Sequence, residues 1–579
     1  MVCVSSMTRT LRVLFLVSAH GSLSQAAQVV LTDLGHEVEV CVVDSPESMQ
    51  DAVRACGPDL IVCPMLKKMI PEAVWSRYRC LIVHPGPIGD RGPSSIDWAI
   101  QLDRSTWGVT VLEANGEFDA GPVWATRTFE LRSTTKSGVY RHEVRRAAID
   151  ALVEAVTMVA RGQEAPDAVE QRGIAVAGQA RPLMRQEARE IDWSTDSTDV
   201  VLRKIRAAEG QPGVLDRIGN SQFHLFGAHS EGTLRGKPGQ IIAQRNGAIC
   251  RATIDGAIWI SHLKQRRTPA RTFLKLPAAT ALAQSGARID VPEVAVPLHV
   301  SHGSGAEDTF RDIVYDEASN VGYLHFDFYN GAMSTEQCQR LRDAYRYARS
   351  RPETSVIALM GGRDFFSTGI HLNVIEAAKD PARESWRNLN AINDVVHDIV
   401  TTDSHYVIAA LSGDAAAGGV PLALAADRTV AREGIVLNPY YGHMGGLYGS
   451  EYWTYLLPRR IGERMATQLT GAPFTPISTN RAVQIGLLDA AFGATVEGFV
   501  ARVRNHAEQF AKRNDLTSRL EVKRRQRAHD ERVKPLEAYR REELARSHRC
   551  FFGSDRRYHH ARHRFAYKLH SVPETSTRT

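Results

Sequence analysis

The sequence has few cysteines and no long apolar run. It contains 8 cysteines in 579 residues, and no two of them form a Cys-x-x-Cys pair. This usage is typical of reduced thiols in a cytoplasmic protein, and it excludes a disulfide scaffold and a zinc site of standard spacing. No stretch approaches the roughly 20 apolar residues that span a membrane. Internal repeats and low-complexity tracts are also absent from the sequence.

The net charge is small and unevenly distributed. The chain carries +6, but residues 521–579 hold 16 Lys and Arg against 8 Asp and Glu, so the rest of the chain is slightly negative. A basic tail can bind nucleic acid, anionic lipid or a phosphorylated small molecule. Hydrophobic content of 43% and charged content of 23% are ordinary for a globular protein. At roughly 150 residues per domain, the length predicts three or four domains.

The first 19 residues loosely resemble a signal peptide. Their apolar run at residues 13–17 is short, however, and an apolar set at helical spacing follows it and stops at Gly35. We therefore expect the chain to open with a β-strand at residues 11–17. Either Met1 or Met7 is expected to start translation.

The pattern of elements predicts a multidomain α/β protein. Over the first 160 residues, strands and helices alternate as in a parallel α/β sheet. Short strands then predict a small β-barrel module, and a second α/β domain follows it. The tail is expected to be a charged helix up to Ser547 and irregular beyond it. The first domain is predicted at residues 1–165 and the barrel module at 180–276, with the Ala/Gly/Pro-rich stretch 163–181 as the linker between them. A second linker is predicted at 277–310, followed by the second α/β domain at 311–512 and the basic tail at 513–579.

A histidine and an aspartate follow predicted strands of the first domain. His84 ends a strand and enters a Gly/Pro-rich loop, at the edge of the sheet where catalytic side chains gather. Asp119 stands in a tight Phe-Asp-Ala-Gly turn. A carboxylate that orients an imidazole and supports its cationic form suits proton transfer. On the residues alone, the structural reading is favoured, because a lone histidine after a strand is more often a structural residue.

These residues resemble the folate-dependent formyltransferase family. Its pattern is Asn-x-His-Pro-Ser-(x)-Leu-Pro-(x)-Arg-Gly, then Gly-Val-Thr, then Asp-x-Gly, and Asp119 follows His84 at the family's separation. The resemblance covers residues 11–160, and residues 182–276 resemble the family's C-terminal barrel. It implies catalytic roles for His84 and Asp119. It also implies that 10-formyltetrahydrofolate is bound, with contacts from Arg91, Gly92 and Thr110.

The chain departs from that family at Ile82, where a catalytic Asn is expected. Losing such a hydrogen-bond donor can cost on the order of a hundredfold in rate. Three explanations stay open. The acceptor is a thiol, whose pKa of about 8.5 makes the thiolate accessible; another group supplies the bond; or this half is an inactive shell.

Two Gly-containing loops mark the second α/β domain, at residues 361–373 and 411–420. Glycine permits turns whose N–H groups converge, and two such donors can hold a thioester oxyanion. The loops resemble the crotonase (enoyl-CoA hydratase/isomerase) family over about residues 313–500. The resemblance implies a coenzyme A ligand and oxyanion donors at the N–H groups of Ile370 and Gly418. We also expect cofactor contacts from Ser367 and Thr368.

The same resemblance indicates changed chemistry. Pro421 stands where hydratases have their first catalytic Glu, and the second falls near Tyr440 or Tyr441, so hydration of an enoyl bond is not expected. Tyr441 and Glu451 are the best candidates for proton handling, as acid and base in either order. Tyr441 could instead be a core residue, and Glu451 a first-turn helix residue favoured by the macrodipole.

Both halves together, with the Tyr/Gly-rich segment at residues 438–460 and the tail motif at residues 534–544, resemble the HypX/HoxX family of hydrogenase maturation factors over nearly the whole chain. The resemblance implies formyl transfer to the CoA thiol, decarbonylation of formyl-CoA, and delivery of CO to the iron of a [NiFe]-hydrogenase. Expected partners are small-molecule substrates and the hydrogenase maturation machinery, with no nucleic acid and no membrane. The basic tail is expected to clamp CoA phosphates, with Arg562 as a ligand. No metal is expected at His559 and His563, which lack companions at ligand spacing.

Other functions fit parts of the sequence. One is an enzyme that forms or hydrolyses formyl-CoA and releases formate. Another combines an inactive transferase half with an ordinary acyl-CoA enzyme. A third, of a different class, is an RNA-binding formyltransferase that uses the basic tail, for which salt-sensitive RNA binding would be the sign.

Overall fold

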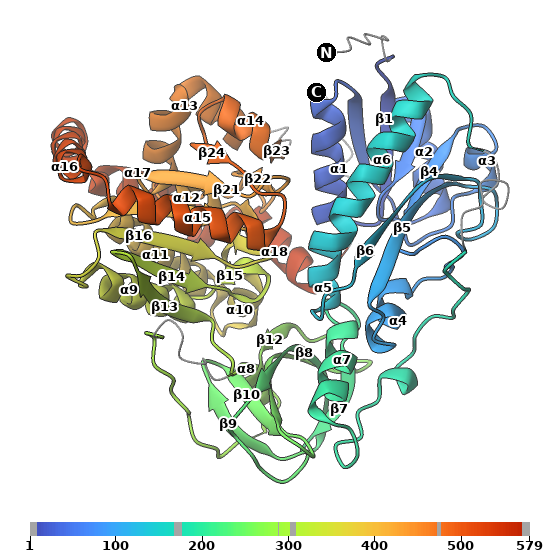
Figure 1. The fold of residues 1–579 in the computed structure, drawn as a ribbon, viewed down its shortest axis with the longest axis horizontal. Helices are drawn as coiled ribbons and strands as arrows, with labels where there is room; N and C mark the ends of the chain where they lie inside the picture. Colours follow the sequence, from blue (N-terminus) through green and yellow to red (C-terminus); the bar gives the residue numbers. More distant parts are fainter. Residues whose placement is uncertain (1–8, 167–175, 288, 301–307, 472–475, 570–579) are drawn as a thin grey trace. The chain divides into compact units, whose positions relative to one another are not determined.

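The computed structural model describes residues 9–166, 176–287, 289–300, 308–471 and 476–569. The chain divides into two compact units (Figure 1). The first unit comprises residues 1–230, 234–242 and 250–263, and the second comprises residues 231–233, 243–249 and 264–579. The choice between Met1 and Met7, and parts of both predicted linkers, fall outside the described residues.

A six-stranded sheet forms the centre of the first unit, in the order β2-β1-β3-β4-β5-β6. Its strands are β1 (Arg12–Val17), β2 (Glu37–Val42), β3 (Leu60–Cys63), β4 (Cys80–His84), β5 (Thr106–Glu113) and β6 (Val123–Glu130). Strands β1 to β4 run parallel, as predicted. Strand β5 is antiparallel to β4 and β6, so the sheet is mixed and the expectation of a parallel sheet was wrong there. The β5–β6 loop is too short for a parallel crossover, which needs a dozen or more residues.

Helices cover both faces of this sheet (Figure 1). They are α1 (Ser22–Asp33), α2 (Pro46–Cys56), α3 (Glu72–Trp75), α4 (Ser95–Gln101), α5 (Lys136–Val139) and α6 (Arg145–Ala160), with a π-helical turn at Tyr140–Val144. Val13 and Phe15 pack into the core that includes α1 and α6, whereas Leu14 packs with α2 on the other face. A strand buried on both faces reads as a continuous apolar run, which is why β1 resembled a signal sequence.

The predicted barrel module is a second six-stranded sheet. It follows a 3-10 turn at Glu187–Arg189 and helix α7 (Thr198–Ala207), and its order is β7-β8-β11-β10-β9 with β12 beside β11. Its strands are β7 (Val214–Ile218), β8 (Ser221–Glu231), β9 (Ile241–Arg245), β10 (Ala248–Ala252), β11 (Ala257–Gln265) and β12 (Lys275–Pro277).

Two further sheets organise the second unit. The larger has the order β13-β14-β16-β19-β21-β24, and it is parallel except where β13 meets β14. Its strands are β13 (Ile313–Ala318), β14 (Val321–Phe326), β16 (Val356–Gly361), β19 (Tyr406–Leu411), β21 (Arg428–Ala431) and β24 (Ala490–Ala491). The smaller sheet contains β17 (Phe365–Ser367), β20 (Asp414–Ala416), β22 (Val436–Asn438) and β23 (Ile477–Ser478). Strands β15 (Ala332–Met333) and β18 (Gly369–Ile370) form a separate pair.

Helices pack on the larger sheet from both sides. The helices of this unit are α8 (Ala278–Gln284), α9 (Thr335–Arg349), α10 (Leu372–Ala377), α11 (Pro381–Val400), α12 (Gly419–Leu424), α13 (Trp453–Thr470), α14 (Thr479–Gln484) and α15 (Val496–Ala511), with a 3-10 turn at Tyr329–Gly331. Helix α9 begins with a capping box: the Ser334 side chain accepts from the N–H of Gln337, and the Gln337 side chain accepts from the N–H of Ser334. The main core lies around α9 and α11, and a second core lies under α15.

The C-terminal segment is more helical than predicted. It forms α16 (Leu516–Val533), α17 (Leu536–Phe552) and α18 (Arg557–Tyr567), so the expectation of an irregular chain after Ser547 was wrong. The physical reason is a buried stripe at helical spacing, in which Tyr558, Arg562 and Ala566 face the unit. No helix among the described residues is both long and apolar enough to cross a membrane.

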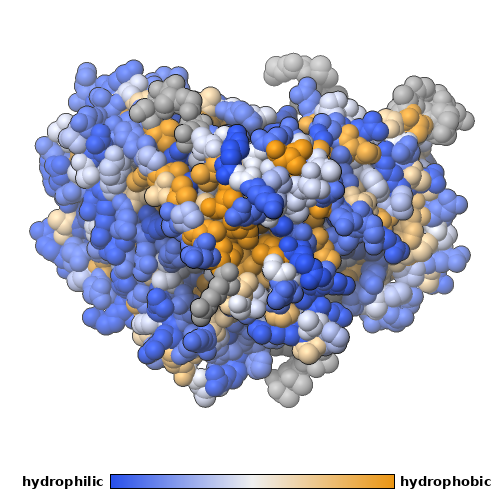
Figure 2. All heavy atoms as spheres, turned by 90° about the horizontal axis from the view of Figure 1, so that it is seen from below, coloured by the Kyte–Doolittle hydropathy of each residue, from blue (hydrophilic) through white to orange (hydrophobic). Residues whose placement is uncertain are grey.

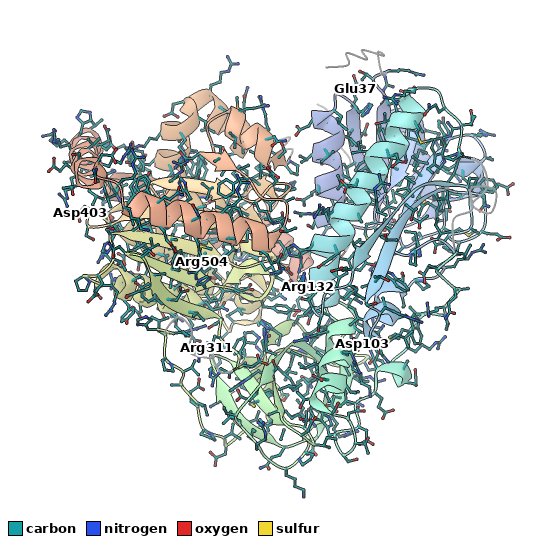
Figure 3. The ribbon with its side chains drawn as sticks, viewed as in Figure 1. Glu37, Asp103, Arg132, Arg311, Asp403 and Arg504 are labelled. Carbon is teal, nitrogen blue, oxygen red and sulfur yellow. The ribbon has the colours of Figure 1, made fainter. Side chains whose placement is uncertain are left out.

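Hydrophilic residues cover most of the face drawn in Figure 2. Charged side chains such as Glu37 and Asp103 project from their elements into solvent (Figure 3), and about three quarters of each is exposed. The described cysteines are free thiols.

Candidate active sites

In the first unit, His84 lies between two carboxylates. It ends β4, is buried, and places Nε2 at 2.9 Å from Asp90 Oδ2 and Nδ1 at 3.3 Å from Asp119 Oδ1. Burial alone lowers the pKa of His84, but the hydrogen bonds to Asp119 and Asp90 outweigh it and raise the pKa to about 9. The imidazole is therefore held as a cation at neutral pH.

The predicted residues Asp119, Gly92 and Thr110 lie around this histidine. Asp119 adopts a left-handed backbone (φ 53°) in its turn and accepts a hydrogen bond from the Gly92 N–H at 3.2 Å. Burial raises the pKa of Asp119, but its bonds with His84 and Gly92 outweigh that and lower it. Thr110 stands opposite His84 in the β4–β5 ladder and donates to the carbonyl of Gly86 at 2.8 Å.

Two other features of this half that the sequence singled out are Arg91 and Ile82. Arg91 is half-exposed and lies 3.7 Å from Glu117. Ile82 is paired with Leu112 inside the sheet and contributes no hydrogen-bond donor from its side chain. The site therefore lacks the side-chain amide that formyltransferases carry at that position.

The described end of the predicted linker packs against the same loop. Gly178 N–H donates to Ile88 at 2.8 Å, and Arg181 N–H donates to Arg91 at 3.0 Å. The Arg181 guanidinium lies 3.6 Å from Asp90 Oδ1. Residues 176–181 thus form one wall of the His84 loop, which the Ala/Gly/Pro-rich composition did not reveal.

In the second unit, Glu451 stands beside the predicted oxyanion donors. Gly418 caps α12, and a Cβ added to it would lie 2.5 Å from Glu451 Oε1. A Cβ added to Gly369 would lie 3.2 Å from the Gly418 nitrogen, so β18, with Ile370 next in sequence, approaches the same point. The structure thus brings Ile370, Gly418 and Glu451 together.

Tyr441 completes this cluster. Its hydroxyl donates to Glu451 Oε2 at 2.8 Å, and the Ser450 N–H donates to the same oxygen at 3.0 Å. Burial raises the pKa of Glu451 to about 7 and that of Tyr441 well above its usual value. The pair therefore offers a carboxyl group poised near neutrality and a phenol that stays protonated.

Sequence reasoning missed the residues that hold Glu451 in place. Glu451 and Tyr452 both have left-handed backbones, with φ of 64° and 57°. Asn393 on α11 accepts from the Glu451 N–H at 2.7 Å and bonds the Ser450 hydroxyl. Glu543 on α17 accepts from the N–H groups of Tyr452 and Thr454, both at 2.9 Å, so it caps α13 from another helix.

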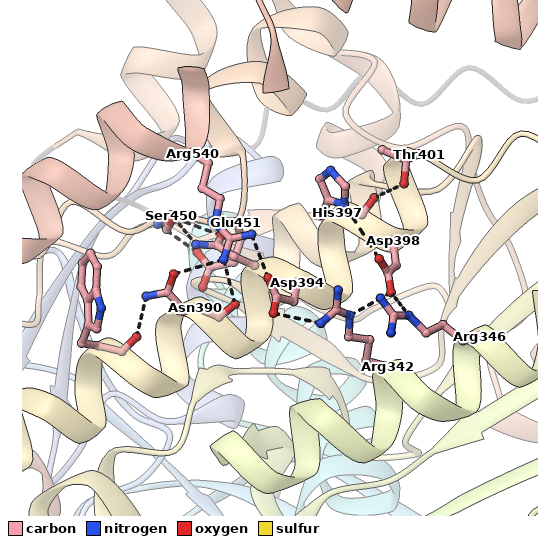
Figure 4. Close-up of polar contacts among 12 residues, drawn as sticks. Arg342, Arg346, Asn390, Asp394, His397, Asp398, Thr401, Ser450, Glu451 and Arg540 are labelled. Carbon is pink, nitrogen blue, oxygen red and sulfur yellow. Dashed lines mark hydrogen bonds and ion pairs between the residues drawn. The ribbon is translucent and has the colours of Figure 1, made fainter. Parts of the chain in front are cut away.

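A charged network docks α17 on α11 beside this site (Figure 4). Arg540 donates to Asp394 at 2.8 Å, and Arg342 on α9 donates to the other oxygen of Asp394 at 3.0 Å. Arg342 and Arg346 also share Asp398. Three helices are thereby joined behind Ser450 and Glu451.

The predicted cofactor contacts of the first Gly loop have internal partners. Ser367 is fully buried, and its hydroxyl accepts from the Gly369 N–H at 3.1 Å. Thr368 donates to the Asn330 carbonyl at 3.2 Å. Both hydroxyls therefore shape the loop. Asn388 fixes it further, because it accepts from the His371 N–H at 3.0 Å and donates to Met333 at 2.9 Å.

Arg562 lies in the second unit and is also engaged. It is buried on α18 and donates to Glu376 on α10 at 2.7 Å, and His563 contacts the other oxygen of that carboxylate. His559 lies 3.0 Å from the Phe551 carbonyl. The phosphate-binding role of Arg562 stays a prediction, with Glu376 as a competing partner.

Comparison with known proteins follows this division. Residues 42–156 match the formyl transferase family, residues 183–276 match the formyl transferase C-terminal domain, and residues 317–571 match the enoyl-CoA hydratase/isomerase family. The hydrogenase maturation factor HoxX of Bradyrhizobium diazoefficiens is 43% identical over 567 residues, which are 98% of this chain and 96% of that protein.

A solved structure is similar over the same extent. HypX from Aquifex aeolicus in complex with tetrahydrofolic acid is 41% identical, with a TM-score of 0.91 over 97% of each chain. The sequence and the fold are therefore similar to those of these two proteins over nearly the whole chain. This protein belongs to the HypX/HoxX family of hydrogenase maturation factors.

Proposed function

We propose that this protein transfers the formyl group of 10-formyltetrahydrofolate to the thiol of coenzyme A and then splits formyl-CoA into carbon monoxide and CoA. The carbon monoxide would become a ligand of the iron in a [NiFe]-hydrogenase. The protein would thus be a bifunctional formyltransferase and formyl-CoA lyase in the cytoplasm, serving the hydrogenase maturation machinery through small-molecule substrates.

One observation carries this proposal: Glu451 and Tyr441 form a hydrogen-bonded pair beside Gly418, while Pro421 occupies the position of a hydratase Glu. The crotonase loops are kept, but the residues that would add water to an enoyl bond are replaced. A thioester bound there would meet the carboxyl group of Glu451, whose pKa burial raises to about 7. That set suits moving one proton within a substrate.

The first step is formyl transfer in the first unit. The CoA thiol loses its proton, and the sulfur forms a bond to the formyl carbon. The pair of the C=O bond moves to oxygen, which needs a hydrogen-bond donor. The pair on oxygen then re-forms the C=O bond as the C–N10 bond breaks, the electron pair of that bond stays on nitrogen, and N10 takes up a proton. The products are formyl-CoA and tetrahydrofolate. The cationic His84 is suited both to donate the hydrogen bond to the oxygen and to supply the proton to N10.

The second step is decarbonylation in the second unit. The formyl carbon has one hydrogen and no α-carbon, so neither hydration nor isomerisation is possible. Glu451 removes the formyl proton, the C–H electron pair becomes the carbon lone pair of CO, and the C–S pair leaves with sulfur. The proton then passes to the thiolate, so no oxidant or other co-reactant is needed. Tyr441 orients the carboxylate by its hydrogen bond, and the N–H groups of Ile370 and Gly418 would hold the carbonyl oxygen.

The test uses the full-length protein with 10-formyltetrahydrofolate carrying a ¹³C-formyl group, and with CoA. Mass spectrometry follows ¹³C-formyl-CoA, a deoxymyoglobin trap follows ¹³CO, and an enzymatic assay follows formate. Wild type is expected to release CO. Glu451→Gln is expected to accumulate formyl-CoA, and Glu353→Gln, which alters an exposed side chain of the same unit, to behave as wild type.

The products also decide between the alternatives. Formate in place of CO would mean that the second unit is a formyl-CoA hydrolase. Absence of formyl-CoA, CO and formate alike would mean an inactive transferase half. If neither the wild-type protein nor Glu451→Gln released CO, the lyase assignment would be refuted.

A further inference from the structure

The contacts of His84 differ on its two sides. Asp90 lies at 2.9 Å from Nε2 and its side chain is 1% exposed, whereas Asp119 lies at 3.3 Å from Nδ1 and is 15% exposed. The shorter contact is therefore on the buried side, and the looser contact is on the side that a substrate can reach. The carboxylate that orients a catalytic imidazole usually holds it from behind, and Asp90 has that position.

A glycine makes the buried contact possible. A Cβ added to Gly86 would lie 2.5 Å from His84 Nε2 and closer still to Asp90 Oδ2. Any side chain at position 86 would thus separate the imidazole from Asp90. The Gly86 carbonyl is held by Thr110, so this loop cannot easily move aside.

Two departures from the formyltransferase pattern meet at this contact. Formyltransferases carry Ser after His-Pro, and this chain has Gly86; they carry an Asn two residues before the His, and this chain has Ile82. The chain has thus lost a neutral donor and gained room for a carboxylate. Both changes make the site depend more on His84 as a charged hydrogen-bond donor.

We propose that Asp90 is a positioning residue that holds the Nε2–H of His84 from the buried side, leaving the Nδ1–H and Asp119 as the donor and acceptor that face the folate formyl group. The catalytic role of that pair rests on the proposed formyl transfer. The contact between Asp90 and His84 does not.

In this arrangement the two carboxylates have different roles, since Asp90 positions the imidazole and Asp119 accepts a proton. Asp90 keeps the ring protonated and fixes its orientation, as in other buried acid–histidine pairs. The formyl oxygen takes the place of Asp119 as acceptor of the Nδ1–H while the C–S bond forms; the oxygen pair then re-forms the C=O bond, and the Nδ1 proton passes to N10 as the C–N10 bond breaks. The vacated Asp119 accepts the thiol proton and releases it to water, and water restores the proton to His84. His84 thus supplies the hydrogen bond that Ile82 cannot.

Other charged groups surround the pair and bear on its titration. Arg181 lies 3.6 Å from Asp90, and the charge of Arg91 acts on Asp119. The half-buried Tyr140 interacts electrostatically with Asp97 and Asp90, and desolvation of its hydroxyl raises its pKa so that it stays neutral. The positive charge of Arg91 helps to lower the pKa of Asp119.

The direct test follows His84 by NMR in full-length protein with ¹⁵N-labelled histidine, and His84→Gln identifies its signals. In wild type, both ring nitrogens are expected to carry protons at pH 7.5. In Asp90→Asn, the midpoint of the titration is expected to fall by about two units, since one carboxylate supports the cation instead of two. Asp103→Asn replaces an exposed residue of the same unit and is expected to leave the midpoint unchanged.

The kinetic test compares formyl transfer by variant and wild type at each pH. At pH 8 the Asp90→Asn rate is expected to be on the order of a hundredfold below wild type. Toward pH 6 the ratio is expected to recover about tenfold, because the imidazole regains its proton. A purely structural role would lower the rate by the same factor at every pH.

A second variant keeps the proposal testable if Asp90→Asn does not fold. Gly86→Ala keeps both carboxylates but separates Asp90 from His84, so it should reproduce the shifted titration while still binding tetrahydrofolate by calorimetry. An unchanged His84 titration in both variants, or a rate ratio that is flat with pH, would overturn the proposal. If wild type forms no formyl-CoA, the proposed function fails, while the NMR titration still decides the role of Asp90.

Discussion

Tyr441 donates its phenolic hydrogen to Glu451 Oε2 at 2.8 Å, and both groups are buried. A phenol that faces a carboxylate in a dry site stays protonated, because its ionisation would place two negative charges side by side. The bond also stabilises the ionised form of Glu451 against the burial that raises its pKa. The pair is thus a hydrogen-bond donor that stays protonated, coupled to a carboxyl group that can exchange its proton near pH 7.

Tyr441→Phe is expected to slow the splitting of formyl-CoA by about a hundredfold. The phenol lowers the pKa of Glu451, so its removal should shift the acidic limb of the pH–rate profile to higher pH. The measurement is CO release from added formyl-CoA between pH 5 and 9. Tyr440→Phe is the matched control, since the ring of Tyr440 packs edge-on against His443. A slow variant with an unshifted profile would contradict the role of the bond.

Glu543→Ala is expected to destabilise the second unit. The substitution removes the acceptor for the N–H groups of Tyr452 and Thr454 in a buried place, at a cost of about 3 kcal/mol in the free energy of unfolding. Urea unfolding measures it. Glu542→Ala removes an exposed neighbour that pairs with Lys534, and it should cost less than about 1 kcal/mol. Equal losses for both variants would argue against the capping role.

The sequence was sufficient to place His84, Asp119, Tyr441 and Glu451 in two sites, because motif loops after strands gather at one sheet edge. It did not show Asp90 at His84, since an aspartate in a Gly/Pro-rich loop resembles a turn residue. Asp90 becomes visible only when the loop folds back at Gly86.

Glu543 was missed for a different reason. Its partners come from α13, far along the chain, and no local pattern reports such a contact. A signal was nevertheless present. The buried face of α17 contains Leu536, Leu544 and Phe551, and Glu543 lies on that face while Glu542 is exposed. A charged residue on the apolar stripe of a helix indicates a buried partner.

The stability of the second unit is expected to depend on pH through Glu451 and Glu543. Burial raises the pKa of each from 4.5 to about 7. The folded state then binds protons that the unfolded state has released, so this contribution to stability is complete below pH 4.5 and lost as the pH rises through 7. For one proton the slope approaches about 1.4 kcal/mol per pH unit. Glu543→Gln should flatten the dependence of the urea midpoint between pH 5 and 7; a curve parallel to wild type would contradict it.

Gly418→Ala is expected to abolish CO release while formyl transfer continues. The added Cβ would lie 2.5 Å from Glu451 Oε1, so the carboxylate must leave its place beside the proposed oxyanion donor. A loss of at least about a hundredfold is expected, as for removal of an oxyanion donor. Gly232→Ala, where the nearest atom lies at 3.4 Å, is the control. Accumulating formyl-CoA would be the positive sign, and normal CO release would refute the placement of the site.

The two activities are expected to be separable by complementation. His84→Gln should make no formyl-CoA but should split it when it is added, because Glu451 and Tyr441 are untouched. Glu451→Gln should make formyl-CoA and stop there. If the intermediate reaches solvent, a mixture of the two variants will release CO in proportion to its concentration, and a formyl-CoA trap will suppress it. If the intermediate stays within one chain, the mixture will release none, although each variant performs its own half-reaction. Restoration of CO by His84→Gln alone, without added formyl-CoA, would refute the assignment of His84 to formyl transfer.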